Sequence, residues 1–374
     1  MKIGVDAREI QDGVVTGIGR SLVNFIGYFA QRNKKHTLVL FSEKNIPIDF
    51  RGNIERVTIK PSVTFIWDQW KLPRHMRAHE IDLFYSPYYK IPVATKILVV
   101  NQILDLMFLV FPYYRKKLGV WKRFYYSVFG KKYARKAVSI ITDSQHAKQD
   151  IIRIWNIDPE KIKVFPLGVA SRYQPVRDTY MINKTRNAYN LPERFILYLG
   201  NFKPHKNVES LIHAFYEICN RFPDYKLVLA GPMDSFGRKM KSLVLEKGIQ
   251  EKVVFTGTVK EEDHPEALYS LAELFVFPTL YEGFGLPPLE AMACGTPVIA
   301  SNRTAVPEVV GEAGILVNPE DIEELSNAIA DLLADPSKRE ILSKKGLERA
   351  KLFKEDKTAG KIYRHLVKIL EDLK

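Results

Sequence analysis

Cysteine is nearly absent from this 374-residue chain, which contains only Cys219 and Cys294. Two cysteines cannot form the disulfide framework of a small secreted domain, and their spacing does not fit a metal site. Polar residues interrupt the longest apolar stretch, 96–112, so the chain has no run of the roughly 18 apolar residues that a membrane-spanning helix needs. The charged amino terminus has no apolar segment of the kind found in signal peptides. We therefore expect a cytoplasmic protein.

The length and the composition are those of a globular protein with more than one domain. At about 150 residues per domain, the 374 residues predict two domains. Apolar residues make up 46% of the chain and charged residues 26%. These fractions are typical of globular chains, so the disordered and fibrous classes are excluded.

Acidic side chains are missing from residues 106–142, and the charge of the chain is uneven. Residues 1–170 contain 28 basic and 14 acidic side chains, whereas the remainder contains 28 and 29. The acid-free stretch holds nine lysines and arginines among ten aromatic residues. Cations and aromatic rings suit the headgroup region of an anionic membrane, so residues 108–136 predict a membrane-surface contact. A basic helix whose aromatic side chains pack inward is the alternative. We do not expect nucleic-acid binding, because no motif for it accompanies the charge.

Short apolar runs alternate with amphipathic helical patterns along the chain, which is typical of parallel sheets covered by helices. Helices are expected at 21–31, 207–221 and 287–293, and residues 161–175 are expected to form a connector. Strands are expected at 2–5, 37–41, 56–59, 83–85, 97–100 and 140–142, and in a second series at 195–199, 226–230, 253–255, 274–277, 297–300 and 314–317.

Two such series joined by a connector predict an α/β protein with two doubly wound, Rossmann-like domains that face one another across a cleft. We expect the first domain at 1–170 and the second at 171–357. Ligands of such sheets bind beyond the carboxyl ends of the strands. The cleft is therefore the expected site.

The segment 275–300 predicts a phosphate-binding turn. A buried strand ends at Pro278, a loop with glycines at 283 and 285 follows, and prolines at 287 and 288 suit the first turn of a helix, where a missing N–H is harmless. The amides of residues 284–286 would then face outward at the positive end of the helix dipole, where phosphate binds well. The two glycines would let the anion approach the backbone closely.

Two glutamates accompany this turn, Glu282 on the loop and Glu290 on the predicted first turn of the helix. A carboxylate accepts two hydrogen bonds, which suits the vicinal hydroxyls of a ribose or a sugar ring. Two acids alone would fit equally well a loop in which Glu290 merely stabilises the helix N-terminus. Together with the glycines and prolines they favour a sugar-nucleotide site.

The seven-residue spacing from Glu282 to Glu290, followed by Ala-Met-Ala-Cys-Gly-Thr-Pro-Val-Ile-Ala-Ser, resembles the signature of the family 4 retaining glycosyltransferases. The resemblance covers nearly the whole chain, with further matching segments at 16–20, 199–207, 256–259 and 306–311. Within the family the chain resembles mannosyltransferases that build cell-surface polysaccharides. The resemblance implies the two-domain GT-B fold, with residues 358–374 packing back on the first domain.

The resemblance also implies a role for each matching residue. Lys206 would neutralise the donor diphosphate, which gains negative charge as it leaves, and Glu282 would orient the transferred sugar. These two are the candidate catalytic residues. Gly17 and Gly19 would belong to a loop that closes over the diphosphate, backbone groups near Gly257 and Val259 would contact the base, and Glu290 would hold the ribose. The expected donor-binding residues are Gly17, Gly19, Asn201, Lys206, Gly257, Val259, Glu282, Gly283, Phe284, Gly285, Leu286 and Glu290.

Three positions depart from the family pattern. Members carry an arginine at the position of Asn201 or of His205, so here the diphosphate would meet one full cation instead of two. The family has a histidine where this chain has Leu104, and leucine can neither donate a hydrogen bond to the sugar nor relay a proton. Gln102 and Asp105 are the polar neighbours left to take part of this role. The expected acceptor-side residues are Gln102, Asp105, Trp67 and Tyr88.

The resemblance implies a retaining glycosyltransferase that moves a sugar from GDP-mannose, or else from a UDP-sugar, to a saccharide or lipid-linked acceptor. The chain has no Asp-x-Asp pair, so a divalent metal bridging the diphosphate is not implied, and no cofactor is expected. We expect it to be peripheral on the inner face of the membrane. The competing prediction is a nucleotide-sugar-binding protein with little or no transferase activity, because Leu104 replaces the expected histidine.

Overall fold

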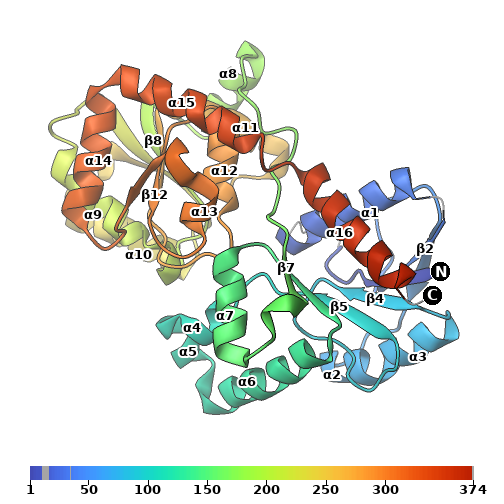
Figure 1. Cartoon of the computed structure of the whole chain (residues 1–374). Coiled ribbons are helices and arrows are strands. Elements are labelled where there is room, and N and C mark those ends of the chain that lie inside the picture. The colour runs from blue at the N-terminus through green and yellow to red at the C-terminus, as the bar shows by residue number, and fades with distance from the viewer. Residues whose placement is uncertain (11–16, 34, 373–374) are drawn as a thin grey trace. The chain divides into compact units, whose positions relative to one another are not determined.

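The structure, a computed structural model, describes residues 1–10, 17–33 and 35–372 (Figure 1). It divides into two compact units. One unit comprises Met1–Gly168 together with the carboxyl-terminal segment from Glu355, and the other comprises Val169–Lys354. Each unit is built around its own parallel sheet.

The sheet of the first unit has the strand order β3-β2-β1-β4-β5-β6-β7. All neighbouring strands pair in parallel, so that Ile3 lies between Leu38 on one side and Leu83 on the other. The inner strands are apolar and buried along almost their whole length, as expected when helices cover both faces of a sheet. The strands are β1 (Lys2–Asp6), β2 (Thr37–Ser42), β3 (Ile54–Thr58), β4 (Leu83–Ser86), β5 (Leu98–Gln102), β6 (Ser139–Thr142) and β7 (Ile162–Val164).

Helices cover both faces of this sheet. On one face α1 packs against α16, since its apolar residues recur at Leu22, Phe25, Ile26 and Phe29, on one side of a helix (Figure 1). On the other face α3, α6 and α7 enclose a second apolar cluster around Trp67. Trp67 is the first residue of the π-helical turn η1, which follows α2 directly. The helices are α1 (Gly17–Arg32), α2 (Thr64–Ile66), η1 (Trp67–Lys71), α3 (Leu72–Ala78), α4 (Met107–Val110), α5 (Pro112–Lys117), α6 (Gly119–Lys136), α7 (Gln145–Trp155), η2 (Pro159–Lys161) and α16 (Glu355–Glu371).

The sheet of the second unit has the order β10-β9-β8-β11-β12-β13, again with parallel pairing. Helix α9 packs against α14, and α12 packs against α15. The strands are β8 (Arg194–Leu199), β9 (Tyr225–Ala230), β10 (Val253–Gly257), β11 (Leu274–Phe277), β12 (Val298–Ser301) and β13 (Ile315–Val317). The helices are α8 (Thr179–Ala188), η3 (Pro204–Lys206), α9 (Val208–Ile218), α10 (Ser235–Glu246), η4 (Gln250–Lys252), η5 (Glu261–Asp263), α11 (Pro265–Leu271), α12 (Leu286–Ala293), α13 (Val306–Val310), η6 (Gly311–Ala313), α14 (Ile322–Ala334) and α15 (Pro336–Ala350).

Every strand predicted from the sequence is present within two residues of its expected ends, but two other predictions are wrong. The connector expected at 161–175 contains the boundary between the two units, after Gly168, but its first residues form β7, a three-residue edge strand whose central Lys163 breaks the apolar pattern. The segment with Gly17 and Gly19, expected to be a loop, forms the first turn of α1, because the buried Gly19 extends the apolar face of that helix towards its N-terminus. Thr16, in the same motif, lies outside the described residues.

Candidate active site

The loop between β11 and α12 ends in a helix N-terminus that is open to a ligand. Gly285 occupies the N-cap with φ of +111°, a conformation that favours glycine. No described side chain caps the first turn of α12, so its amides are left to water or to an anion. The ring of Phe284 is buried against Phe353, with 6.0 Å between ring centroids, and anchors the loop. The amides of residues 284–286 thus belong to a firmly held turn.

Lys206 and Glu282 meet at this loop. Lys206 ends the short η3 helix after β8, and its Nζ lies 2.5 Å from Oε1 of Glu282. Both side chains are largely withdrawn from solvent, and the ammonium lies 5.0 Å from the centroid of the Phe277 ring. Charges buried to this degree need a partner. The structure therefore brings together the two residues that the sequence analysis named as catalytic.

Two threonines that the sequence analysis did not single out hold Glu282 in place. Thr279 is fully buried, and its Oγ1 lies 2.9 Å from Oε1 of Glu282 and 2.8 Å from the carbonyl oxygen of His205. The Thr279 hydroxyl has a single proton to donate, and the Glu282 carboxylate is a stronger acceptor for it than the His205 carbonyl oxygen. Thr304 accepts a hydrogen bond of 3.0 Å from the Glu282 amide. Among the described side chains, Lys206 and Thr279 contact this carboxylate at Oε1. Its Oε2 can therefore accept a hydrogen bond from a ligand hydroxyl.

His205 and Asn201, the two positions at which the resemblance leads us to expect an arginine, bring no positive charge to the site. Burial, followed by the nearby Lys206 and Lys203, lowers the pKa of His205 to about 3. Its imidazole is therefore neutral at physiological pH. The amide oxygen of Asn201 accepts a hydrogen bond from the Lys203 amide at 3.2 Å. Lys206 is consequently the cation that is paired with Glu282.

Glu290 is held by a different set of contacts. Its Oε2 accepts a hydrogen bond of 3.0 Å from the hydroxyl of Tyr269, and its side chain is nearly buried. Burial and the Glu290 carboxylate together raise the pKa of both Tyr269 and Cys294. The placement of Glu290 in the first helical turn was wrong, because α12 begins at Leu286, one residue earlier than predicted, and Glu290 falls in the second turn. Glu290 is therefore no helix cap.

The remaining predicted donor residues lie in three separate elements. Gly17 and Gly19 belong to the first turn of α1, where a Cβ at position 17 would touch nothing that the structure describes. Gly257 ends β10 with φ of +76° after an irregularity in the strand register, and Val259 follows it, half-buried. Gly283 is buried on the β11–α12 loop beside Glu282.

The predicted acceptor-side residues are mostly engaged within the first unit. Oε1 of Gln102 accepts a hydrogen bond of 2.6 Å from Tyr85, and Asp105 accepts one of 2.9 Å from the Met107 amide. Leu104, between them, is half-buried. The expectation that Trp67 lines the acceptor side is wrong, because its ring is fully buried in the core beneath the guanidinium of Arg8.

Arg8 organises a polar cluster at the carboxyl end of β1 that the sequence analysis missed. Its guanidinium binds Asp6 at 2.6 Å and Asp68 at 2.7 Å, and it lies 5.7 Å from the centroid of the Tyr88 ring. Burial raises the pKa of Asp68 to about 6, in spite of the Arg8 charge. The sequence signal was Asp6 and Arg8 at the carboxyl end of the first strand.

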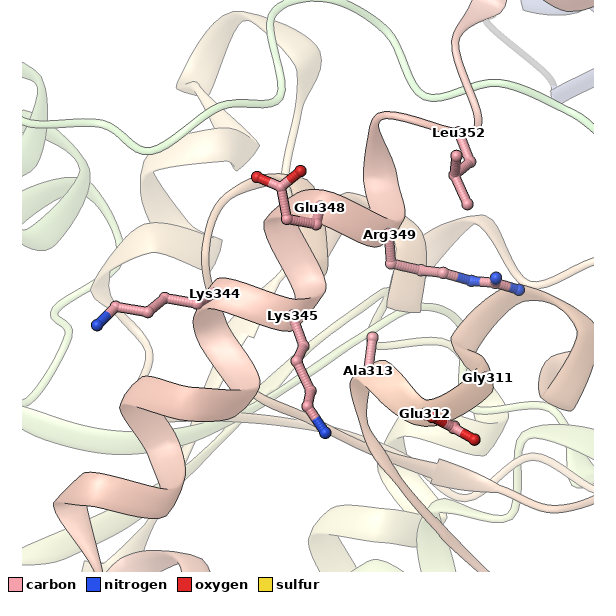
Figure 2. A pocket seen from close by; sticks show the side chains of 8 residues that line it. All are labelled: Gly311, Glu312, Ala313, Lys344, Lys345, Glu348, Arg349 and Leu352. Carbon is pink, nitrogen blue, oxygen red and sulfur yellow. The ribbon is translucent and has the colours of Figure 1, made fainter.

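A cavity of about 740 Å³ lies between η6 and α15 in the second unit (Figure 2). Arg349 points along one side of it and donates hydrogen bonds to the carbonyl oxygens of Val309 at 2.9 Å and Glu308 at 2.6 Å. These are the last carbonyls of α13, so Arg349 fixes the helix that follows Thr304. The lining residues are Gly311, Glu312, Ala313, Lys344, Lys345, Glu348, Arg349 and Leu352.

The helix α6 has apolar side chains on two faces. Its inner aromatic side chains pack, with Phe129 stacked on Tyr125 at 4.7 Å and Phe129 and Tyr133 against the core. Its outer face exposes Trp121 and Phe124, with Val120 and Val128 beside them. The inward packing and the exposed apolar surface are therefore both present in the 108–136 segment.

None of the described helices combines the length and apolar character that crossing a bilayer requires. Within the same described ranges, no three His, Cys, Asp or Glu side chains gather as metal ligands would.

Comparison with known proteins gives a family match for each half of the chain. The family model of the group 1 glycosyl transferases matches residues 181–349, and that of glycosyltransferase family 4 matches residues 15–172. Over 219 residues the chain is 37% identical to the O-antigen chain mannosyltransferase B of Escherichia coli, and this alignment covers 57% of the chain and 56% of that protein. The chain thus spans about half the length of this curated relative.

Two solved structures resemble the whole chain. Sucrose-phosphate synthase from Thermosynechococcus elongatus matches with a TM-score of 0.75 and 24% identity, over 98% of this chain and 99% of that one. HepE from Anabaena, in complex with UDP and glucose, matches with a TM-score of 0.76 and 19% identity, over 98% of this chain and 100% of that one. These matches confirm the predicted fold class, the α/β GT-B fold.

Proposed function

Because the chain belongs to the glycosyltransferases of group 1 and family 4, we propose that it transfers a mannosyl residue from GDP-mannose to a saccharide or lipid-linked acceptor. The proposed reaction retains the anomeric configuration and uses no metal ion. The observation that carries the proposal is the Lys206–Glu282 pair on the loop that leads into the uncapped N-terminus of α12. The mannosyl assignment rests on the sequence resemblance and is supported by the mannosyltransferase relative.

In this proposal Lys206 exchanges one anion for another. Without ligand its ammonium binds Glu282. With donor bound, the diphosphate takes over the ammonium and the amides of residues 284–286, and these groups stabilise the negative charge that the leaving nucleotide gains. Glu282, still held by Thr279, accepts a hydrogen bond from a hydroxyl of the transferred sugar. Glu290 binds the ribose hydroxyls. The acceptor attacks the face from which the diphosphate departs, so no enzyme nucleophile is needed.

A panel of donors tests the proposal directly. A ligand that binds only the folded state raises the melting temperature, so GDP-mannose should stabilise the protein more than UDP-sugars, GDP-glucose or free mannose do. Transfer is then measured with the donor that stabilises most. A shift by UDP-sugars alone would replace GDP-mannose by the UDP-sugar alternative, which the HepE complex with UDP supports. No shift with any nucleotide would contradict the whole proposal.

Leu104 motivates a second candidate function, binding of a nucleotide sugar with little or no turnover. The two polar neighbours of Leu104 already serve Tyr85 and the Met107 amide. Leu104→His separates the two functions. A large gain of transfer in this variant would indicate that the chain binds donor without efficient catalysis, whereas wild-type turnover that the histidine does not improve favours the enzyme as it stands.

We also propose an anionic membrane surface as the partner of residues 108–136, at the inner face of the membrane. The support is the exposed apolar outer face of α6 together with the absence of acidic residues from 106–142. The inner leaflet attracts cations through its anionic lipids. The protein should sediment with phosphatidylglycerol vesicles and be released by salt. Equal binding to neutral vesicles would contradict this partner.

A further inference from the structure

A second apolar surface lies on the helix that begins at Thr64. Val63, Ile66 and Trp70 follow one another at the spacing of one helical face, and they are 71%, 46% and 73% exposed. Phe65 beside them is also exposed. We call Val63, Phe65, Ile66 and Trp70 the α2–η1 patch. Single exposed apolar side chains are common, but large apolar side chains that gather into one exposed patch mark an interaction site.

The opposite face of the same helix is already buried. Trp67, Leu72 and Met76 belong to the apolar core of the first unit. The segment runs without a break through the π-helical turn η1 into α3, and π turns often accompany functional sites. The core of the unit therefore does not use the α2–η1 patch, which remains available to a partner.

The exposed charges along the chain segment that carries the patch are of one sign. Asp68 is the only acidic residue between Arg56 and His79, and it is buried and paired with Arg8. Lys60 and Arg74, by contrast, are exposed. An apolar patch between exposed cations is complementary to a lipid surface with anionic headgroups and an apolar interior.

The helix α6 shows the same arrangement on the same face of the sheet. Trp121, Phe124 and Val128 are exposed from its amino-terminal turn to its middle, and exposed Lys132 and Arg135 follow towards its carboxyl-terminal end. Residues of α3 and α6 pack into one common core, and Figure 1 shows α2 and α6 on the side of the sheet opposite α1 and α16. The two exposed surfaces thus belong to one layer of the first unit.

We propose that the α2–η1 patch inserts into an anionic lipid bilayer as a second contact beside α6. This inference rests on the proposed membrane partner and adds residues outside the 108–136 segment to it. Val63, Ile66 and Trp70 enter the apolar region, and Lys60 and Arg74 remain at the headgroups. Two separated apolar contacts fix the orientation of the first unit on the surface, which a single helix does not.

The four tryptophans allow a direct test. Trp70 and Trp121 are exposed, whereas Trp67 and Trp155 are fully buried. In Trp121→Phe, Trp70 is the exposed tryptophan that remains, and in Trp70→Phe it is Trp121. Each variant, with the double variant as blank, is mixed with phosphatidylglycerol vesicles whose acyl chains carry bromine, a short-range quencher. We expect quenching and a blue shift of the emission in both single variants and neither in the blank.

The outcomes distinguish the two proposals. Quenching in Trp70→Phe but not in Trp121→Phe overturns the α2–η1 contact and leaves the α6 contact intact. Quenching in neither single variant overturns both. A blue shift in Trp121→Phe that depends on protein concentration without lipid would instead assign the patch to a second copy of the chain.

A binding measurement provides an independent readout. Ile66→Ser should lower the vesicle partition coefficient by about tenfold, since an inserted aliphatic side chain loses its apolar surroundings. Ile341→Ser, at a comparably exposed position on α15 of the second unit, is the matched control and should have no effect. Equal partition of both variants and the wild type would contradict the proposal.

Discussion

Replacing Thr279 by valine tests how the carboxylate of Glu282 is held. Valine has nearly the same shape as threonine, so in this fully buried site the change removes the hydroxyl without opening a cavity. The lost hydroxyl lies 2.9 Å from Oε1 of Glu282. A hydrogen bond to a charged group contributes about 1.5–3 kcal/mol. If half of this energy orients Glu282 in the transition state, kcat/KM falls by roughly 4- to 12-fold.

The assay measures kcat and KM separately for wild type, Thr279→Val and Thr279→Ser, with the melting temperature of each. Serine keeps the hydroxyl and removes only a methyl group, so it should retain most of the activity while losing some stability. Wild-type kcat/KM in a folded Thr279→Val protein would refute the positioning role. Equal losses in both variants would show that packing, and not the hydrogen bond, is what Thr279 supplies.

Three further predictions concern other parts of the molecule. Transfer should persist in EDTA, because the proposed mechanism stabilises the leaving group with Lys206 and backbone amides; activity that EDTA removes and Mg²⁺ restores would contradict it. Burial, followed by Lys163 and Lys368, lowers the pKa of His365 to about 4, so the stability that neutral His365 gives is present above pH 6.5 and lost as the pH falls towards 4. Unfolding curves over that range should show this loss in the wild type and less of it in His365→Gln, and equal slopes would contradict the assignment. Arg349→Met should cost about 1–3 kcal/mol in the free energy of unfolding, because two carbonyl oxygens of α13 lose a charged donor; an unchanged denaturation midpoint would show that water replaces it.

Much of the fold follows from local pattern, because buried parallel strands are nearly continuous apolar runs. The strand β7 was not predicted, because it has only three residues at the edge of the sheet and its central lysine interrupts the apolar run. The start of α1 was misplaced because glycine is a weak helix former, yet Gly19 is buried on the apolar face of the helix.

The candidate site was predictable where its residues form a motif in the chain and not where contacts are distant in sequence. Lys206 and Glu282 were named from their motifs, and the structure joins them across 76 positions. Thr279 and Thr304 were not predicted, because they act through hydrogen bonds with His205 and Glu282 that only the fold creates. Trp67 and Trp70 are three residues apart, and the sequence does not reveal which of the two faces the core.

Calorimetric titration with a nucleoside diphosphate measures whether Lys206 binds the diphosphate of the donor, the contact on which the proposed transfer depends. Lys206→Met is compared with Lys206→Arg, which keeps the charge, and with Lys203→Met, which removes an exposed lysine from the same segment. Loss of a charge-assisted contact of about 1.5–3 kcal/mol should weaken the affinity of Lys206→Met by roughly 10- to 150-fold, with a smaller loss in Lys206→Arg and none in Lys203→Met. Equal affinity of Lys206→Met and the wild type would show that Lys206 does not bind the diphosphate.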